Sequence, residues 1–229
     1  MIVGHIGVRK NSKGVSGKNF RLISGKPLID WSLDQLFRCN LIDHVVVSTD
    51  CDVMYQHSIK KGALDIGLRP DVLANDTAAK WDVWKHSLNV IEQEIGKIDL
   101  FVDLDCTSPL RADQDILDAI ALFQDRMPDM VMSCCDAKKN PYFNLVEPDK
   151  DGFLRVSKKV DGGVVARQLA PLVLEHAAST YVINPQYLHS CSGLFEGNVL
   201  PYIMPTERCI DIDSELDFKI VEFLMEGKV

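Results

Sequence analysis

Apolar residues along the chain follow two different periods. Residues 2–8 and 45–50 are short runs rich in β-branched side chains, which is typical of buried strands. Elsewhere apolar residues recur every three or four positions, which predicts helices with one buried face. The helical stripes are Ile29, Leu33, Leu36 and Phe37; Trp81, Trp84, Leu88, Ile91 and Ile95; Ile116, Ile120 and Phe123; and Leu216, Ile220, Phe223 and Leu224. Strands that alternate with helices predict an α/β fold, with a mostly parallel central sheet and helices on both faces.

Turn-forming residues predict the remaining boundaries. Asp76 or Thr77 is the expected N-cap of the helix that carries Trp81, and Asp113 that of the next helix. The two tryptophans could stack on a base, but their helical spacing favours packing in the core. Further elements are expected over 52–61 (helix) and over 99–105, 130–132 and 178–184 (strands).

Residues 136–176 differ from the rest of the chain. They hold several prolines, glycines and charges without a sustained period, which predicts an excursion of β-hairpins away from the main sheet. A length of 229 residues is enough for one large domain with an ample core. We therefore treat 1–229 as a single domain that contains this excursion.

Composition narrows the class of protein. Apolar residues make up 46% and charged residues 25% of the chain, as in ordinary globular proteins. The net charge of −8 disfavours a nucleic-acid-binding surface, and no run of about 18 apolar residues predicts a membrane span. Seven scattered cysteines and six histidines lack zinc-site spacing, and the N-terminus lacks a signal-peptide pattern. We expect a cytoplasmic protein with reduced thiols.

A basic loop follows the first predicted strand. Residues 9–19 contain four cations, two glycines, two serines and two asparagines, and no acid. Backbone amides of a glycine turn, together with cations, can hold a polyphosphate at a strand end; a solvated basic loop is the alternative. The loop is not Gly-x-x-x-x-Gly-Lys-Ser/Thr, because Ser12 and Asn19 stand at two required positions. It also lacks the Gly-x-Gly-x-x-Gly of dinucleotide-binding folds.

A pair of carboxylates near the C-terminus is the second chemical signal. Asp211 and Asp213 are separated by one isoleucine, and in an extended strand they would lie about 6–7 Å apart on one face. Two such carboxylates repel each other unless a cation lies between them, and Mg²⁺ accepts carboxylates together with phosphate oxygens. Ser214 and Asp217 resemble a helix capping box, which would explain Ser214 and leave Asp211 unexplained.

These segments together resemble the acylneuraminate (CMP-sialic acid) cytidylyltransferases. The basic loop is similar to that family's Arg-x-Gly-Ser-Lys-Gly-x-x-Gly-Lys-Asn, and only Asn11 departs from it. Residues 107–111 match the end of its Leu-Gln-Pro-Thr-Ser-Pro-Leu-Arg, in which Asp105 and Cys106 replace Gln and Pro. The Asp-Ile-Asp of the family stands at 211–213, so the matches span nearly the full chain in the family's order.

Two further segments resemble the family less completely. Residues 167–171 look like its Arg-Gln-x-x-Pro. Its Asn-Gly-Ala-Ile-Tyr corresponds to the stretch that ends at Tyr181, where Ala177 and Ala178 replace Asn and Gly. In the family the glutamine replaced by Asp105 is associated with the sugar. These changes therefore favour a sugar other than N-acetylneuraminate.

The resemblance implies a nucleotide-diphosphosugar-transferase-like fold, a homodimer formed through 136–176, and the substrates CTP and a 2-keto-3-deoxy sugar acid. With Mg²⁺ as cofactor, the products would be a CMP-sugar and pyrophosphate. Arg9, Lys18 and Asp211 are the candidate catalytic residues, and Asp211 and Asp213 the candidate metal ligands. Nucleotide binding is assigned to Arg9, Ser12, Lys13, Lys18, Asn19, Arg69 and Arg111. Sugar binding is assigned to Asp105, Arg167, Gln168 and Tyr181, where Asp105 is either a third metal ligand, a hydroxyl acceptor or only a turn former.

The identity of the acid stays open at this point. Sialic, legionaminic or pseudaminic acid are the first candidates; Kdo, Kdn or a phosphonate are alternatives within the same reaction. A non-catalytic nucleotide-binding homologue is the alternative from another class. Retention of Arg9, Lys18 and both aspartates argues against it, because a carboxylate pair without a cation is destabilising.

Overall fold

The computed structural model describes residues 1–10, 15 and 17–227. The strands of its main sheet are β1 (Ile2–Gly7), β4 (His44–Ser48), β5 (Leu100–Leu104), β6 (Met130–Asp136), β9 (Leu174–Ile183) and β10 (Val199–Ile203). The helices are α1 (Leu28–Arg38), α2 (Asp52–Lys60), α3 (Lys80–Ile95), α4 (Asp113–Arg126), α5 (Pro185–Ser190) and α6 (Glu215–Met225). Smaller elements are η1 (Lys18–Phe20), β2 (Leu22–Ile23), β3 (Lys26–Pro27), η2 (Asp71–Leu73), β7 (Val146–Pro148), β8 (Leu154–Val156), η3 (Arg167–Leu169) and η4 (Thr206–Arg208).

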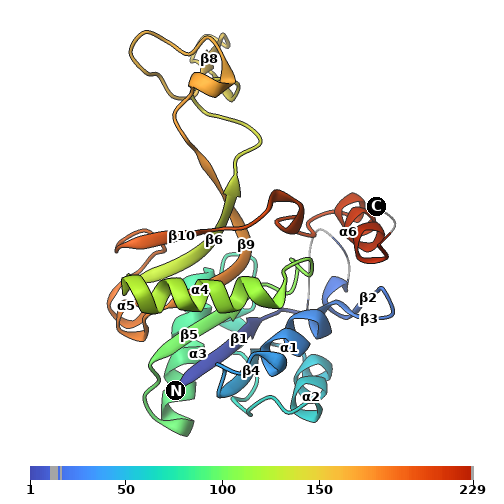
Figure 1. The fold of residues 1–229 in the computed structure, drawn as a ribbon. Coiled ribbons are helices and arrows are strands. Elements are labelled where there is room, and N and C mark those ends of the chain that lie inside the picture. The colour runs from blue at the N-terminus through green and yellow to red at the C-terminus, as the bar shows by residue number, and fades with distance from the viewer. Residues whose placement is uncertain (11–14, 16, 228–229) are drawn as a thin grey trace.

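The central sheet is mixed and mostly parallel, as predicted. Its strand order is β10-β6-β9-β5-β1-β4. β1 pairs in parallel with β4 and β5, and β10 pairs in parallel with β6. Among the described strands of this sheet, only β9 runs antiparallel, between β5 and β6. Figure 1 shows β1 and β5 at the middle of the molecule, where their carboxyl ends point to the same edge.

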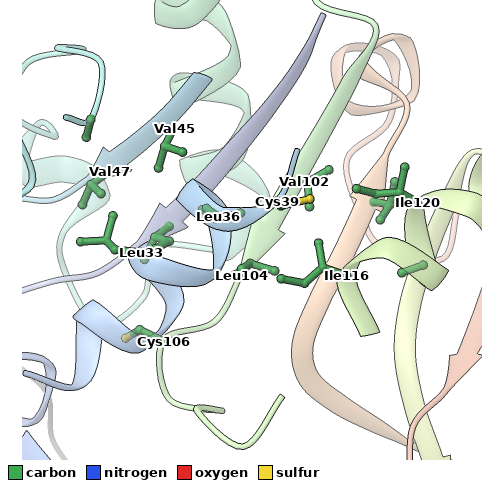
Figure 2. Close-up of a cluster of buried hydrophobic side chains, with 14 of the residues drawn as sticks. Leu33, Leu36, Cys39, Val45, Val47, Val102, Leu104, Cys106, Ile116 and Ile120 are labelled. Atoms are coloured by element: carbon green, nitrogen blue, oxygen red, sulfur yellow. The ribbon is translucent and has the colours of Figure 1, made fainter. Parts of the chain in front are cut away.

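Helices cover both faces of this sheet, and the period-two pattern of each strand supplies both cores. Val45 and Val47 of β4 belong to a cluster that also contains side chains of α1, α2 and α4, whereas Val46 belongs to a second cluster, with side chains of α3 and α5. Figure 2 shows the first of these clusters, in which Leu33 and Leu36 of α1 approach the apolar face of the sheet. A third cluster joins α6 to α1 and to the β2–β3 hairpin. The predicted three-layer arrangement is therefore confirmed.

Some local predictions are wrong. Phe37, assigned to a buried stripe, is exposed. Leu216, Ile220 and Phe223 of the stripe expected in α6 are exposed as well, and the buried face of that helix is formed by Phe218 and Val221. α3 begins at Lys80 after Ala79, so neither Asp76 nor Thr77 is its N-cap; Thr77 instead donates to the side chain of Asn75. Asp113 is the first residue of α4 rather than its cap, and the Asp115 side chain accepts the Ala112 amide there. The interpretation of the α3 tryptophans as core residues is confirmed.

The chain between β6 and β9 leaves the sheet and projects from it, as Figure 1 shows. It contains the antiparallel β7–β8 pair and the short turn η3, and it lies within the segment expected to be an excursion. Many of its large apolar side chains are exposed. None of the helices in the described part of the chain combines the length and the apolar character that a membrane span needs.

Candidate active site

The carboxyl ends of β1, β4 and β5 meet at one edge of the sheet, and the predicted site residues collect there. The chain leaves β1 at Val8 and Arg9, and it leaves β5 at Asp105. The Val8 amide still donates to the Ser48 carbonyl of β4 at 3.0 Å. Ligands of open α/β sheets bind at this edge, because side chains and loops converge there around the strand ends.

The basic loop reaches the C-terminal carboxylate segment. Lys18 Nζ donates to the Ile212 carbonyl at 2.5 Å and lies 3.8 Å from Asp213 Oδ1, although 194 positions separate Lys18 from Ile212. Asn19 is buried and donates to the Arg9 carbonyl at 3.1 Å. Gly17 takes a left-handed conformation, with φ of 64°, at the start of η1. Ser12 and Lys13, which the sequence assigns to phosphate binding, lie outside the described residues.

Asp211 and Asp213 do not lie on a strand, contrary to the prediction. They belong to a loop between η4 and α6, held by a 3.0 Å hydrogen bond from the Ile212 amide to the Thr107 carbonyl. The side chain of Asp213 is 81% exposed, whereas Asp211 is partly buried. The alternative explanation of Ser214 is also correct, because Ser214 and Asp217 form the capping box of α6.

Electrostatics set Asp211 apart from ordinary carboxylates. Burial raises the pKa of Asp211, and the neighbouring charges of Asp213 and Asp105 raise it further, against a hydrogen bond from Thr107 and the charge of Lys18. Its Oδ1 atom is buried and has no hydrogen-bond partner among the described residues. A buried acceptor beside a second carboxylate fits a hard cation. Within the described ranges, no group of three or more His, Cys, Asp or Glu side chains forms a complete metal cage.

Two cavities open at this edge of the sheet. Cavity A, of about 250 Å³, is lined by Arg9, Arg69, Lys80 and Asp105 among others. Cavity B, of about 360 Å³, is lined by His176, Asp211 and Asp213 among others. Tyr181 connects them, because its hydroxyl lies 2.9 Å from His176 Nε2 and its ring lies 4.2 Å from Lys80 Nζ.

The two arginines assigned to nucleotide binding have different surroundings. Arg69 lines cavity A and is anchored to β4 by a 3.0 Å bond from its Nε to the Ser48 hydroxyl; burial lowers the pKa of Arg69 to about 10. Arg111 is only 2% exposed and lines neither cavity. Its guanidinium donates to Ser32, Gln35 and Ser179, at 2.7 to 3.2 Å. The structure thus favours a role for Arg111 in joining α1 to β9.

The excursion carries Arg167 and Gln168 away from both cavities. They lie in η3, and Arg167 donates to the Ala137 carbonyl at 3.2 Å. Figure 1 places this segment beyond the C-terminal end of β6 and the N-terminal end of β9. Within one chain, the structure does not bring these two residues to the site.

Sequence reasoning missed a buried charged cluster beneath cavity A. His5 Nδ1 donates to Asp103 Oδ1 at 2.5 Å, and Lys80 Nζ lies 3.0 Å from Asp103 Oδ2. Both Asp105 oxygens accept from Lys80 at 2.6 Å. The sequence did contain a signal, because His5 and Asp103 are titratable residues inside two apolar strand runs. Buried charged groups are usually paired, so two such residues can be expected to meet in the fold.

Comparison with known proteins agrees with this geometry. A family model described as Cytidylyltransferase matches residues 5–152. The chain belongs to the cytidylyltransferase family. The CMP-N,N'-diacetyllegionaminic acid synthase of Campylobacter jejuni is 37% identical over 96% of this chain and 93% of its own length. The post-translational flagellin modification protein B of Campylobacter coli shows the same identity and coverage.

More distant relatives are cytidylyltransferases as well. The N-acylneuraminate cytidylyltransferase of Escherichia coli is 27% identical over 99% of this chain and 52% of its own length. The solved structure of a CMP:2-keto-3-deoxy-manno-octonic acid synthetase with CTP covers 100% of this cytidylyltransferase and 99% of its own chain, with a TM-score of 0.70 at 15% identity. The last likeness shows the fold alone. The family predicted from the sequence motifs is thus confirmed.

Proposed function

We propose that this cytidylyltransferase activates a nonulosonic acid with CTP and releases pyrophosphate. The observation that carries the proposal is the contact between Lys18 and the Asp211–Asp213 loop. This contact brings a cation-rich loop and a carboxylate pair together, at the edge of the sheet where nucleotides bind in α/β folds. A non-catalytic binding protein would have no use for Asp211, because burial raises its pKa and its charged form is costly.

In the proposed reaction, the anomeric hydroxyl oxygen of the sugar acid forms a bond to the α-phosphorus of CTP. The bond from that phosphorus to the bridging oxygen breaks, pyrophosphate leaves with the electron pair, and the hydroxyl proton is released. Arg9 and Lys18 stabilise the negative charge that spreads over the transferring phosphoryl group. Arg69, fixed in cavity A by Ser48, contributes positive charge on the nucleotide side. Asn19 keeps the backbone of Arg9 in place.

The proposed cofactor is Mg²⁺, with Asp211 and Asp213 as the residues that hold it. The unpartnered Oδ1 atom of Asp211 and its proximity to Asp213 support this assignment. When bound, the ion would neutralise phosphate oxygens and lower the pKa of the attacking hydroxyl. Lys18 lies 3.8 Å from Asp213, so it keeps the carboxylate loop near the triphosphate with or without the ion.

The sugar proposed first is a legionaminic-type acid. The relatives at 37% identity include an enzyme named for N,N'-diacetyllegionaminic acid, and they match nearly the full chain. The N-acylneuraminate enzymes are less similar. The departures at Asp105, Ala177 and Ala178 point the same way, because they change residues expected to face the sugar.

A homodimer formed through the excursion completes the proposal. Its exposed apolar side chains would be costly in water, and a second copy would cover them. They are Leu145, Val146, Phe153, Leu154, Val156, Val160, Val165, Leu169 and Leu172. In a dimer, Arg167 and Gln168 could reach the partner's cavities, which they do not reach within one chain. A cytoplasmic location is proposed because CTP is found there and the seven cysteines are unpaired.

An oxygen-label experiment tests the proposed bond formation. N,N'-diacetyllegionaminic acid is equilibrated in ¹⁸O-water, so that its anomeric oxygen is labelled, and is then incubated with enzyme, CTP and Mg²⁺. We expect one CMP-sugar for each pyrophosphate, with the label in the CMP-sugar and none in the pyrophosphate. Label in the pyrophosphate, or CTP cleavage that does not depend on the sugar, would contradict the proposal.

A further inference from the structure

Lys80 occupies an unusual position at the floor of cavity A. It is the first residue of α3, and its Nζ lies within 3.0 Å of three carboxylate oxygens: Asp103 Oδ2 and both oxygens of Asp105. Asp103 is fully buried and also accepts from His5, whose second ring nitrogen lies 3.0 Å from the Ser87 hydroxyl. The cluster therefore ties the ends of β1 and β5 to the start of α3.

The ammonium group of Lys80 is directed at these carboxylates. It donates a hydrogen bond to each oxygen of Asp105 and forms an ion pair with Asp103. The rings of Tyr181 and Trp84 lie 4.2 Å and 5.0 Å from Nζ. Lys80 lines the cavity, and two of its hydrogen bonds go to Asp105. These two bonds make Asp105 the group through which Lys80 acts on a substrate.

Asp105 is the carboxylate of the cluster that lines the cavity. Its side chain is 20% exposed and lines cavity A beside Arg9 and Arg69. Each carboxylate oxygen has two lone pairs; Lys80 uses one on each, and the Tyr181 side chain also hydrogen-bonds this carboxylate. The remaining lone pair can accept an O–H or N–H group, whereas the nearby ammonium repels a divalent cation.

We propose that Lys80 is a positioning residue, which fixes Asp105 as an acceptor for a neutral O–H or N–H donor of the bound substrate and excludes the metal ion from this carboxylate. The inference rests on the proposed function and adds a specificity element to it. The donor belongs either to the ribose of CTP or to a hydroxyl or acylamino group of the sugar acid. The metal site is then restricted to Asp211 and Asp213.

Asp105→Asn separates the two roles that a carboxylate could have here. The asparagine keeps the shape and one acceptor oxygen, so the fold should persist, and a thermal melt checks this. Titration with Mn²⁺, followed by electron paramagnetic resonance without substrate, is expected to match the wild type. Asp211→Asn is the positive control and is expected to lose most Mn²⁺ binding. Equal losses of Mn²⁺ binding in Asp105→Asn and Asp211→Asn would overturn the inference.

Steady-state kinetics of Asp105→Asn identify the source of the donor. The KM for one substrate is expected to rise about tenfold, since a charged acceptor is replaced by a neutral one. A rise for the sugar acid assigns the donor to the sugar. A rise for CTP, with lost discrimination against 2′-deoxy-CTP, assigns it to the ribose. Unchanged KM values for both substrates would overturn the inference.

Lys80→Gln tests the lysine itself. Without the ammonium, Asp105 carries an uncompensated charge, so Mn²⁺ binding is expected to increase by one site, and the double variant Lys80→Gln/Asp105→Asn is expected to lose that gain. Lys85→Gln on the same helix is the matched control. No gain in a folded Lys80→Gln would contradict metal exclusion; if Lys80→Gln does not fold, the Asp105→Asn titration decides. These titrations need no turnover, so they can fail or succeed independently of the proposed reaction.

Discussion

Asp115 connects the start of α4 to the loop that carries the carboxylate pair. Its side chain is 1% exposed and accepts four hydrogen bonds. The Ala112 amide donates at 2.8 Å, Arg208 donates through Nε at 2.9 Å and Nη2 at 2.7 Å, and the Tyr202 hydroxyl donates at 3.0 Å. Arg208 closes η4, three residues before Asp211. Asp115 should therefore stabilise both the fold and the geometry of the proposed metal ligands.

Asp115→Asn should destabilise the protein by about 2.5 kcal/mol. Its amide nitrogen cannot accept, so the bidentate Arg208 pair is lost; hydrogen bonds to charged groups are worth about 1.5–3 kcal/mol. The lower end applies, because Arg208 is partly exposed and screened by water. Weakening of the capping bond adds about 1 kcal/mol. For a domain of this size, the total corresponds to a fall in Tm of about 5–10 °C.

Differential scanning calorimetry at pH 7 measures this change directly. Asp118→Asn is the matched control, because Asp118 lies on the exposed side of the same helix and should leave Tm nearly unchanged. The kcat of Asp115→Asn should also fall below that of the control, since the carboxylate loop loses its anchor. A Tm for Asp115→Asn within about 2 °C of the wild type would refute the reasoning.

The other predictions concern the site and the excursion. The pKa of Asp211 is raised in the folded state, so ionisation of this carboxyl destabilises the fold as pH rises through that pKa. Asp211→Asn should therefore increase Tm at pH 7 without metal, and this gain in Tm should disappear as pH falls toward 3.8. An unchanged Tm at pH 7 would contradict this. The same variant should abolish turnover. Lys18→Met should lower kcat about 100-fold in pyrophosphate assays, whereas Lys10→Met should not; equal rates would remove Lys18 from catalysis. Phe153→Asp should shift a dimer to monomers in light scattering, and an unaltered mass would place the interface elsewhere.

The layers of the fold were predictable because they depend on periodicity alone. The stripes of α1, α3 and α4 and the runs of β1, β4 and β5 follow from burial on one or both faces. Helix starts were harder to predict, because several polar residues compete for each cap. α4 shows this: Asp113 looks like a cap in the sequence, but Asp115 accepts the free amide in the structure.

The motifs predicted which residues would lie close together, because each motif carries several polar residues in one short segment. Lys18 meets the loop of Asp211 and Asp213 in the structure, and Arg9 follows β1 at the same edge of the sheet. The Lys80 cluster was not predictable, since its members come from β1, α3 and β5, and only the tertiary fold brings them together. The form of the Asp211 segment was also missed, because an alternating pattern with buried isoleucines fits a loop anchored on both sides as well as a strand.

Pyrophosphate release with CTP and Mg²⁺, measured against a panel of nonulosonic and octulosonic acids, tests the central claim most directly. UTP in place of CTP, and EDTA in place of Mg²⁺, are the controls. We predict release with a legionaminic-type acid, only with CTP and only with metal, and its loss in Asp211→Asn. No release with any acid of the panel, from a folded protein that still binds CTP in calorimetry, would contradict the account and favour a nucleotide-binding role without catalysis.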